Sequence, residues 1–98
     1  MSEIFLAAPV RTPIGRFGGA LASLSAAELG GLAARETIHR SGLAADAIGH
    51  AVFGNARQAG GGPNPARQIG RRAGLPDASV AFTVNMACAS GLQAIVSA

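Results

Sequence analysis

The sequence predicts an α/β fold, a βαβαβα segment built on a mostly parallel sheet. Short apolar runs rich in β-branched and aromatic residues alternate with longer segments whose apolar residues recur at helical spacing. Glycine, proline and helix-capping residues separate these segments. Strands that alternate with helices favour right-handed βαβ units, in which ligands bind at the carboxyl ends of the strands.

The first strand and first helix are predicted in the N-terminal half. Residues 4–8 form a continuous apolar run that ends at Pro9, which is typical of a strand buried on both faces. After a turn-rich stretch, residues 25–28 read Ser-Ala-Ala-Glu, the capping-box pattern of a helix start. We expect this helix to run to about Ser41 and to end with Gly42 in the left-handed conformation.

Two further strands enclose a shorter helix. Residues 51–53 form an apolar run, which we expect to be a strand beside the first one. After a loop, Asn64 and Pro65 suit the N-cap and first helical position of a helix of two turns, which residues 74–76 end. The third strand is predicted over residues 79–84.

Cys88 follows the third strand and precedes an alanine-rich helical segment, residues 89–98. We therefore expect it near the first turn of a helix, where unpaired N–H groups and the positive end of the macrodipole favour a thiolate. The same N–H groups could hold an oxyanion. Gly91 would allow a backbone or ligand to approach closely. The alternative is that Cys88 is a small buried apolar residue with no chemical role.

Composition indicates part of a larger protein. The 98 residues are 49% hydrophobic and only 13% charged, which indicates that much of the surface contacts further protein. The last helical segment has no glycine, proline or basic residue to end it at Ala98, so we expect an incomplete domain.

Charge and cysteine content argue against several classes of function. The net charge is +3, and the arginine cluster at positions 67, 71 and 72 is predicted to be a solvated helix face and not a nucleic-acid site. A single cysteine allows no internal disulfide, and metal-binding spacings are absent, so a reducing cytoplasm fits. We expect no export signal and no membrane contact.

Three segments, in this order, resemble the thiolases, also called acetyl-CoA acetyltransferases or 3-ketoacyl-CoA thiolases. They are residues 9–19 (PVRTPIGRFGG), residues 54–55 with 62–68 (GN and GPNPARQ), and residues 85–92 (NMACASGL). The resemblance spans nearly the whole chain. Pro63 departs from the glutamine of many members, which bears on loop packing or subunit contacts but leaves the chemical assignment alone.

The resemblance implies a partial thiolase-like fold, with residues 1–98 as the N-terminal portion of the nucleophile-bearing domain. It also implies that Cys88 attacks an acyl-CoA or 3-ketoacyl-CoA thioester and carries the acyl group as an acyl-enzyme. In such proteins a histidine base and a second cysteine come from later sequence. We therefore expect the chain alone to be inactive and its parent to be a homodimer or homotetramer. Coenzyme A thioesters are the expected substrates, and no cofactor or metal is expected.

Two histidines lie outside these segments, and two alternative functions stand beside the thiolase assignment. His39 is expected on a helix surface and His50 at a strand entry, and neither matches a catalytic histidine motif. The nearest enzymatic alternative is a decarboxylating ketoacyl synthase, which resembles thiolases in fold. The alternative from another class is a non-catalytic fragment that only binds a partner subunit.

Overall fold

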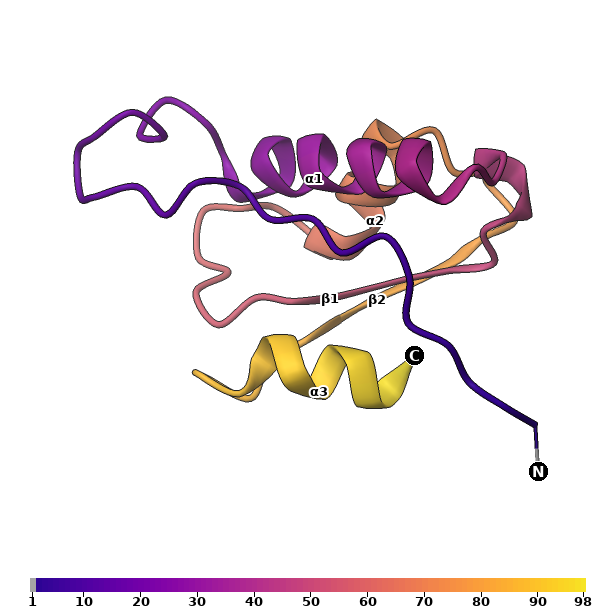
Figure 1. Ribbon diagram of the computed structural model, residues 1–98. Helices are drawn as coiled ribbons and strands as arrows, with labels where there is room; N and C mark the ends of the chain where they lie inside the picture. The colour runs from indigo at the N-terminus through magenta and orange to yellow at the C-terminus, as the bar shows by residue number, and fades with distance from the viewer. Residues whose placement is uncertain (1) are drawn as a thin grey trace.

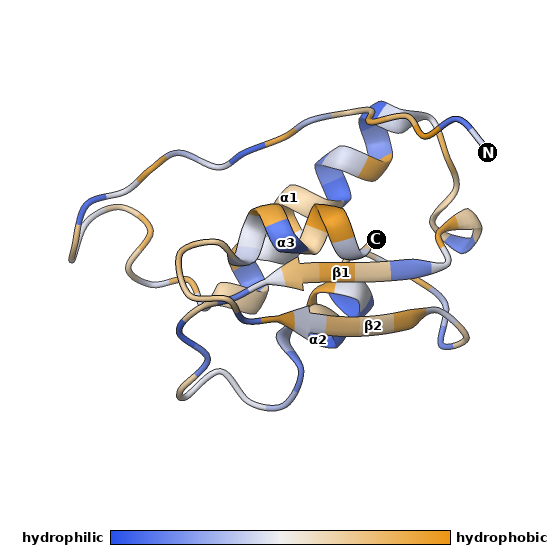
Figure 2. Cartoon of the chain, turned by 90° about the horizontal axis from the view of Figure 1, so that it is seen from below, coloured by the Kyte–Doolittle hydropathy of each residue, from blue (hydrophilic) through white to orange (hydrophobic). Residues whose placement is uncertain are grey.

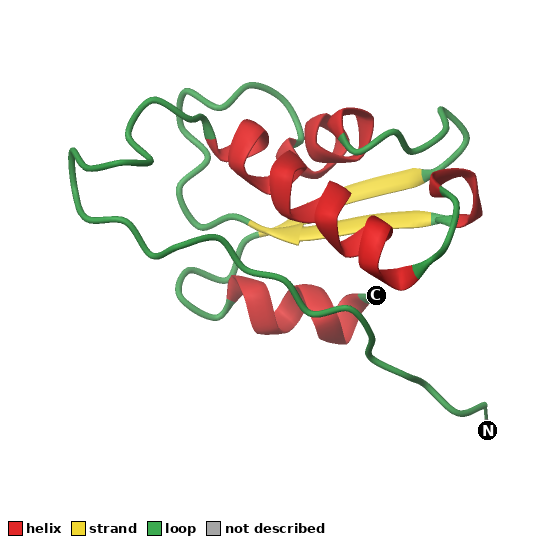
Figure 3. Ribbon diagram, turned by 45° about the horizontal axis from the view of Figure 1, so that its top comes forward, coloured by secondary structure: helices red, strands yellow, loops and turns green. Residues whose placement is uncertain are grey.

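The computed structural model describes residues 2–98 as a small parallel sheet between helices. In chain order the elements are α1 (Ala26–Ser41), the 3-10 helix η1 (Ala45–Ala47), β1 (His50–Gly54), α2 (Pro65–Arg72), β2 (Val80–Val84) and α3 (Ser90–Ser97). The two strands pair in parallel, with His50 opposite Val80 and Gly54 opposite Val84. Helices α1 and α2 lie on one side of the sheet and α3 lies on the other (Figures 1 and 3). The predicted α/β architecture with a parallel sheet is confirmed.

The prediction of a first strand over residues 4–8 is wrong. These residues form no strand in the part of the chain that the structure describes, and Ile4, Phe5 and Leu6 are 79–89% exposed. Ala8 has a φ of 51°, which interrupts an extended backbone. A strand also needs a neighbour to accept and donate its ladder hydrogen bonds, and the run has none here. Instead, β1 pairs with β2.

Helix α1 begins and ends as its sequence predicts. The Ser25 hydroxyl accepts a hydrogen bond from the Glu28 N–H, and the Glu28 carboxylate accepts one from the Ser25 N–H. This capping box pairs two backbone donors that the helix leaves free. These bonds lower the pKa of the Glu28 carboxyl group, with the bond from the Ser25 backbone as the largest cause. Gly42 ends the helix with a φ of 73°.

Helix α2 begins at Pro65, after Asn64, as predicted, but Asn64 does not cap it with its side chain. Asn64 takes a φ of 40°, and its side chain turns to β2. Ala73 follows the helix, and the turn closes at Gly74, where φ is 87°. The predicted end of the helix is therefore confirmed. The Asn64 side chain binds β2 instead of capping the helix as expected.

The core is small, and several apolar side chains lie outside it. The buried apolar residues of the described chain are Ala27, Ala51, Ala66, Ile69, Ala73, Leu75 and Ala94. On α3, Leu92, Ile95 and Val96 are 57–70% exposed. Figure 2 shows the hydrophobic colour on this helix. Burial of apolar surface is the main force that stabilises folded chains. Because these side chains remain largely exposed to solvent, they contribute little of that stabilisation within residues 2–98.

Candidate functional site

Cys88 lies between the carboxyl end of β2 and the start of α3. The strand ends at Val84, and α3 begins at Ser90 with Ala89 as its N-cap. Cys88 directly precedes that N-cap, and it is a free, exposed cysteine. The N–H groups at a helix start and the helix dipole stabilise negative charge nearby. The structure therefore places Cys88 where the sequence predicts, and its chemical role stays a prediction.

The turn that carries Cys88 has a strained residue beside the cysteine. Ala87 has a φ of 49°, a left-handed conformation that costs a residue with a Cβ about 1–2 kcal/mol. Its N–H donates to the Asn85 side-chain oxygen at 3.1 Å, and its carbonyl accepts from the Ser90 hydroxyl at 2.6 Å. Side chains on both sides of Cys88 therefore hold the backbone of the turn.

Gly54 lets α3 approach the sheet closely. A Cβ at this position would lie 2.6 Å from the Gly91 nitrogen and closer still to the carbonyl group of Ser90. A side chain at Gly91, by contrast, would meet nothing within 4 Å. No other part of residues 2–98 therefore approaches the Cβ position of Gly91, and close approach of a ligand there stays a prediction. The glycine that permits close contact between α3 and the sheet is Gly54, on β1.

A second set of polar contacts joins the loop before α2 to β2. The Asn64 amide donates to the Ala81 carbonyl at 3.0 Å, and its oxygen accepts from the Thr83 hydroxyl at 2.7 Å. The Thr83 hydroxyl also accepts from the Ala66 N–H at 3.0 Å. The Gln68 amide donates to the carbonyls of Gly61 and Pro63, both at 2.8 Å. Asn64 and Thr83 therefore join the start of α2 to the strand that leads to Cys88, and Gln68 holds the loop before α2.

The loop after β1 also contacts the turn that carries Cys88. The Asn55 N–H donates to the Val84 carbonyl at 3.0 Å, which extends the pairing of the strands by one step. The Asn85 amide donates to the Ala56 carbonyl at 3.3 Å. The carboxyl ends of both strands thus meet at one edge of the sheet, as expected for a parallel arrangement.

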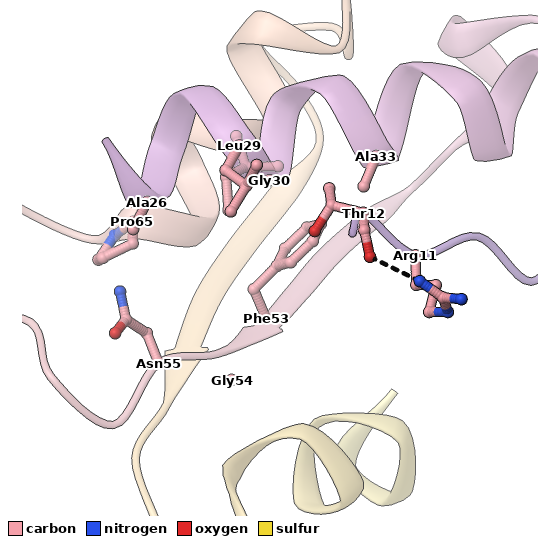
Figure 4. A pocket seen from close by; sticks show the side chains of 11 residues that line it. Arg11, Thr12, Ala26, Leu29, Gly30, Ala33, Phe53, Gly54, Asn55 and Pro65 are labelled. Carbon is pink, nitrogen blue, oxygen red and sulfur yellow. Dashed lines mark hydrogen bonds between the residues drawn. The ribbon is translucent and has the colours of Figure 1, made fainter. Parts of the chain in front are cut away.

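A pocket of about 390 Å³ opens beside this edge, between α1, β1 and the N-terminal segment. Figure 4 shows the Phe53 ring pointing from β1 toward α1 and Thr12. Gly54 and Asn55 line the same pocket. Cys88 is not among the residues that line it in the described part of the chain. Of the three segments that resemble thiolases, residues 9–19 and residues 54–55 with 62–68 therefore meet at this pocket. Residues 85–92 lie on the other side of Gly54, where the backbone of α3 packs against it.

The arginine cluster differs in part from its prediction. Arg71 and Arg72 are exposed, and Arg71 pairs with Asp77. Arg67 is not part of a solvated face, because its guanidinium donates to the Ser79 carbonyl at 2.9 Å and to the Asp77 carbonyl at 3.1 Å. It stabilises the connection between α2 and β2.

The two histidines lie where the sequence places them. His39 is exposed on α1, and His50 is exposed at the first position of β1. Among residues 2–98, no group of three or more histidine, cysteine or acidic side chains is placed to hold a metal ion. No helix in the described part of the chain has the length and apolar character needed to cross a membrane.

Sequence reasoning missed Ser90, Asn85 and Gly54 as residues that shape the site. Each of these residues contacts backbone groups that are distant in sequence or lie across a turn, and hydrophobic periodicity does not predict such contacts. A glycine within a strand pattern can mark a site where another backbone approaches closely. That sign was present at Gly54.

The family model described as "Thiolase, N-terminal domain" matches residues 4–98. The chain is 44% identical over 93 residues to the acetyl-CoA acetyltransferase of Syntrophomonas wolfei, a match that covers 95% of this chain and 24% of that relative. It is 38% identical over 96 residues to the acetyl-CoA acetyltransferase of Cupriavidus necator, covering 98% of this chain and 24% of that protein.

A solved structure gives the same result for the fold. The crystal structure of the Acat5 thiolase from Ascaris suum in complex with coenzyme A matches with a TM-score of 0.88 and 43% identity, covering 90% of this chain and 23% of that one. The chain thus spans about a quarter of the length of the relatives it matches.

Proposed function

Because the chain belongs to the thiolase family, we propose that residues 1–98 are the N-terminal portion of its nucleophile-bearing domain, which they do not complete. We propose further that the whole protein transfers acyl groups between acyl-CoA thioesters through Cys88. The observation that carries this proposal is an exposed cysteine at the carboxyl end of a parallel strand and the start of a helix. The acetyl-CoA acetyltransferase relatives support the reaction class.

The reaction consists of two acyl transfers. In the first, the Cys88 thiolate attacks the carbonyl carbon of an acyl-CoA, the bond from that carbon to the CoA sulfur breaks, and CoA leaves as a thiol after taking up a proton. In the second, a base takes a proton from the α-carbon of a second acyl-CoA, the resulting carbanion attacks the acyl group, a carbon–carbon bond forms, and the bond to the Cys88 sulfur breaks to release a 3-ketoacyl-CoA and the thiolate. In the cleavage direction, Cys88 attacks the 3-keto carbon, the carbon–carbon bond breaks, the acyl-CoA carbanion takes up a proton, and the thiol of another CoA removes the acyl group from Cys88. The two thioesters are similar in energy, so the intermediate forms from either direction.

The start of α3 at Ser90, directly after Cys88 and Ala89, supports this assignment on electrostatic grounds. Negative charge develops twice on the path, first as the thiolate and then on the oxygen of the tetrahedral intermediate. N–H groups fixed in place for such charge stabilise it without reorganisation. The relatives' names favour this reaction over the decarboxylating condensation of a ketoacyl synthase.

Exposed apolar residues support the proposal that these residues form one part of a domain. Phe5 and Leu6 are about four-fifths exposed, and the apolar side chains Leu92, Ile95 and Val96 of α3 are more than half exposed within residues 2–98. In the whole protein we expect further layers to cover them. We also propose a homodimer or homotetramer and a cytoplasmic location for the whole protein, with no cofactor beyond its CoA substrates.

The chain alone is expected to be inactive as a thiolase. Its relatives are about four times longer. The histidine base and second cysteine that the family resemblance implies are not in these residues, and catalytic residues that act as a unit lose most of their effect when one is missing. The measurement is CoA-dependent cleavage of acetoacetyl-CoA by the purified chain, with Cys88→Ser as the background. Robust cleavage above that background would refute the proposal that these residues are an incomplete domain.

A further inference from the structure

We propose that Ser90 is a positioning residue for Cys88. Its buried hydroxyl holds the Cys88 turn, which we define as residues 85–89, in the conformation that presents the thiol at the start of α3. The inference rests on the proposed function, since positioning matters for the reaction only if Cys88 is the nucleophile.

The Ser90 hydroxyl makes two hydrogen bonds that reach back across the cysteine. Ser90 is 4% exposed, and it is the one buried polar residue in the part of the chain that the structure describes. Its oxygen accepts from the Met86 N–H at 2.9 Å and donates to the Ala87 carbonyl at 2.6 Å. The first residue of α3 is therefore tied to the two residues that precede Cys88, so that the cysteine is enclosed in a small hydrogen-bonded loop.

These bonds maintain Ala87 in a left-handed backbone conformation, which is unfavourable for alanine. Ala87 has a φ of 49°, and residues with a Cβ leave this region unless their surroundings hold them there. Asn85 binds the N–H of Ala87 and Ser90 binds its carbonyl. Without the Ser90 hydroxyl, the Ala87 carbonyl would keep the backbone N–H of Ser90, at 3.2 Å, but would lose its shorter bond, and the Met86 N–H would lose the hydroxyl that it binds. The peptide between Ala87 and Cys88 would then be freer to rotate, and that rotation would move the cysteine relative to the helix start.

Close packing against the strand fixes the position of the Ser90 backbone. The Ser90 backbone lies against Gly54, where no side chain could fit. Ser90 is thus a rigid anchor between the end of β1 and the Cys88 turn. Ser97, on the same helix, offers a contrast, because it is exposed and its hydroxyl accepts a hydrogen bond from Gln93, at 3.1 Å, and makes no bond to the Cys88 turn within the described residues.

The test measures the rate at which iodoacetamide alkylates Cys88 in the 98-residue chain between pH 5 and 9. For the unsubstituted chain, the proposed function predicts faster reaction below pH 7 than for a free thiol such as glutathione. We expect Ser90→Ala to slow this reaction by about tenfold, because two hydrogen bonds to the turn are lost. Ser97→Ala is the matched control and is expected to react like the unsubstituted chain. Circular dichroism reports the helix content of each variant.

A rescue experiment separates positioning from a general loss of stability. Glycine adopts a positive φ without strain. The double variant Ser90→Ala with Ala87→Gly is therefore expected to recover about half or more of the lost rate on a logarithmic scale. A hydroxyl that served only to satisfy buried polar groups would give no such recovery, because a glycine at residue 87 supplies no replacement hydrogen bond.

The outcomes distinguish the two proposals. Slow alkylation of Ser90→Ala, normal alkylation of Ser97→Ala and recovery in the double variant would support the positioning role. An unchanged rate in Ser90→Ala, or no recovery in the double variant, would overturn that role while the fast reaction of the unsubstituted chain still supported the proposed function. An unsubstituted chain that has the helix content of the structure by circular dichroism and still reacts like glutathione at every pH would overturn both.

Discussion

Replacing Cys88 by serine in the whole protein is expected to reduce acyl transfer by about three orders of magnitude or more. A serine hydroxyl is almost entirely protonated at neutral pH, so it lacks the anion that attacks the thioester. Cys88 is exposed, and the substitution exchanges one sulfur for one oxygen, so we expect no loss of folding stability. The measurement is the rate of acetoacetyl-CoA formation from acetyl-CoA, with no malonyl donor present.

Two controls make this result specific. The thermal midpoint of Cys88→Ser should equal that of the unsubstituted protein, and Ser97→Ala should retain full activity because the Ser97 hydroxyl binds Gln93 and not the Cys88 turn. If Cys88→Ser kept most of its activity, another group would be the nucleophile. If product formed only with a malonyl donor, the reaction would be that of a ketoacyl synthase.

Replacing Gly54 by alanine is expected to displace α3 and with it the Cys88 turn. The added methyl group would lie 2.6 Å from the Gly91 nitrogen, and its neighbours are backbone atoms that cannot rotate away. Overpacking of this kind costs about 3 kcal/mol of unfolding free energy. We expect a lower midpoint in urea and slower alkylation of Cys88, because the helix start no longer sits beside the thiol.

Gly49→Ala is the matched control for this experiment. Gly49 lies directly before β1, and a side chain there would meet nothing within 4 Å. The Gly49→Ala variant should therefore fold as the unsubstituted chain does, and its Cys88 should be alkylated at the same rate. Equal stability and equal alkylation for the two variants would show that α3 does not depend on close contact with Gly54.

Local signals in the sequence predict much of the helical structure correctly. Ser25 and Glu28 form the capping box, and Gly42 adopts the left-handed conformation that ends α1. Pro65 begins α2 because its missing N–H costs nothing at a helix start. Each of these features depends on neighbours within a few residues, which is why the sequence alone reveals them.

Features that depend on distant partners are predicted poorly. The apolar run at residues 4–8 has the composition of a strand, but a strand forms only where another segment completes its hydrogen bonds. Asn64 reads as an N-cap, yet its side chain binds β2, 17 and 19 residues away. Arg67 reads as part of an exposed face, and it binds carbonyls after α2 instead.

The candidate site divides in the same way. The position of Cys88 at a strand end and helix start follows from patterns on either side of it, and the structure confirms that position. The conformation of the turn does not follow from those patterns, because it depends on Asn85 and Ser90 bonding to the backbone of Ala87. Alanine at a positive φ is unfavourable by itself, so no propensity would predict it.

The most direct test of the central claim is to trap the acyl group on the protein. The whole protein is mixed with acetyl-CoA, quenched in acid within its first turnover, and digested for peptide mass spectrometry. We predict one acetyl group on the peptide that contains Cys88, removable by hydroxylamine and by added CoA. An active protein that carries its acetyl group on another residue, or that shows no acetyl group on Cys88, would contradict the account.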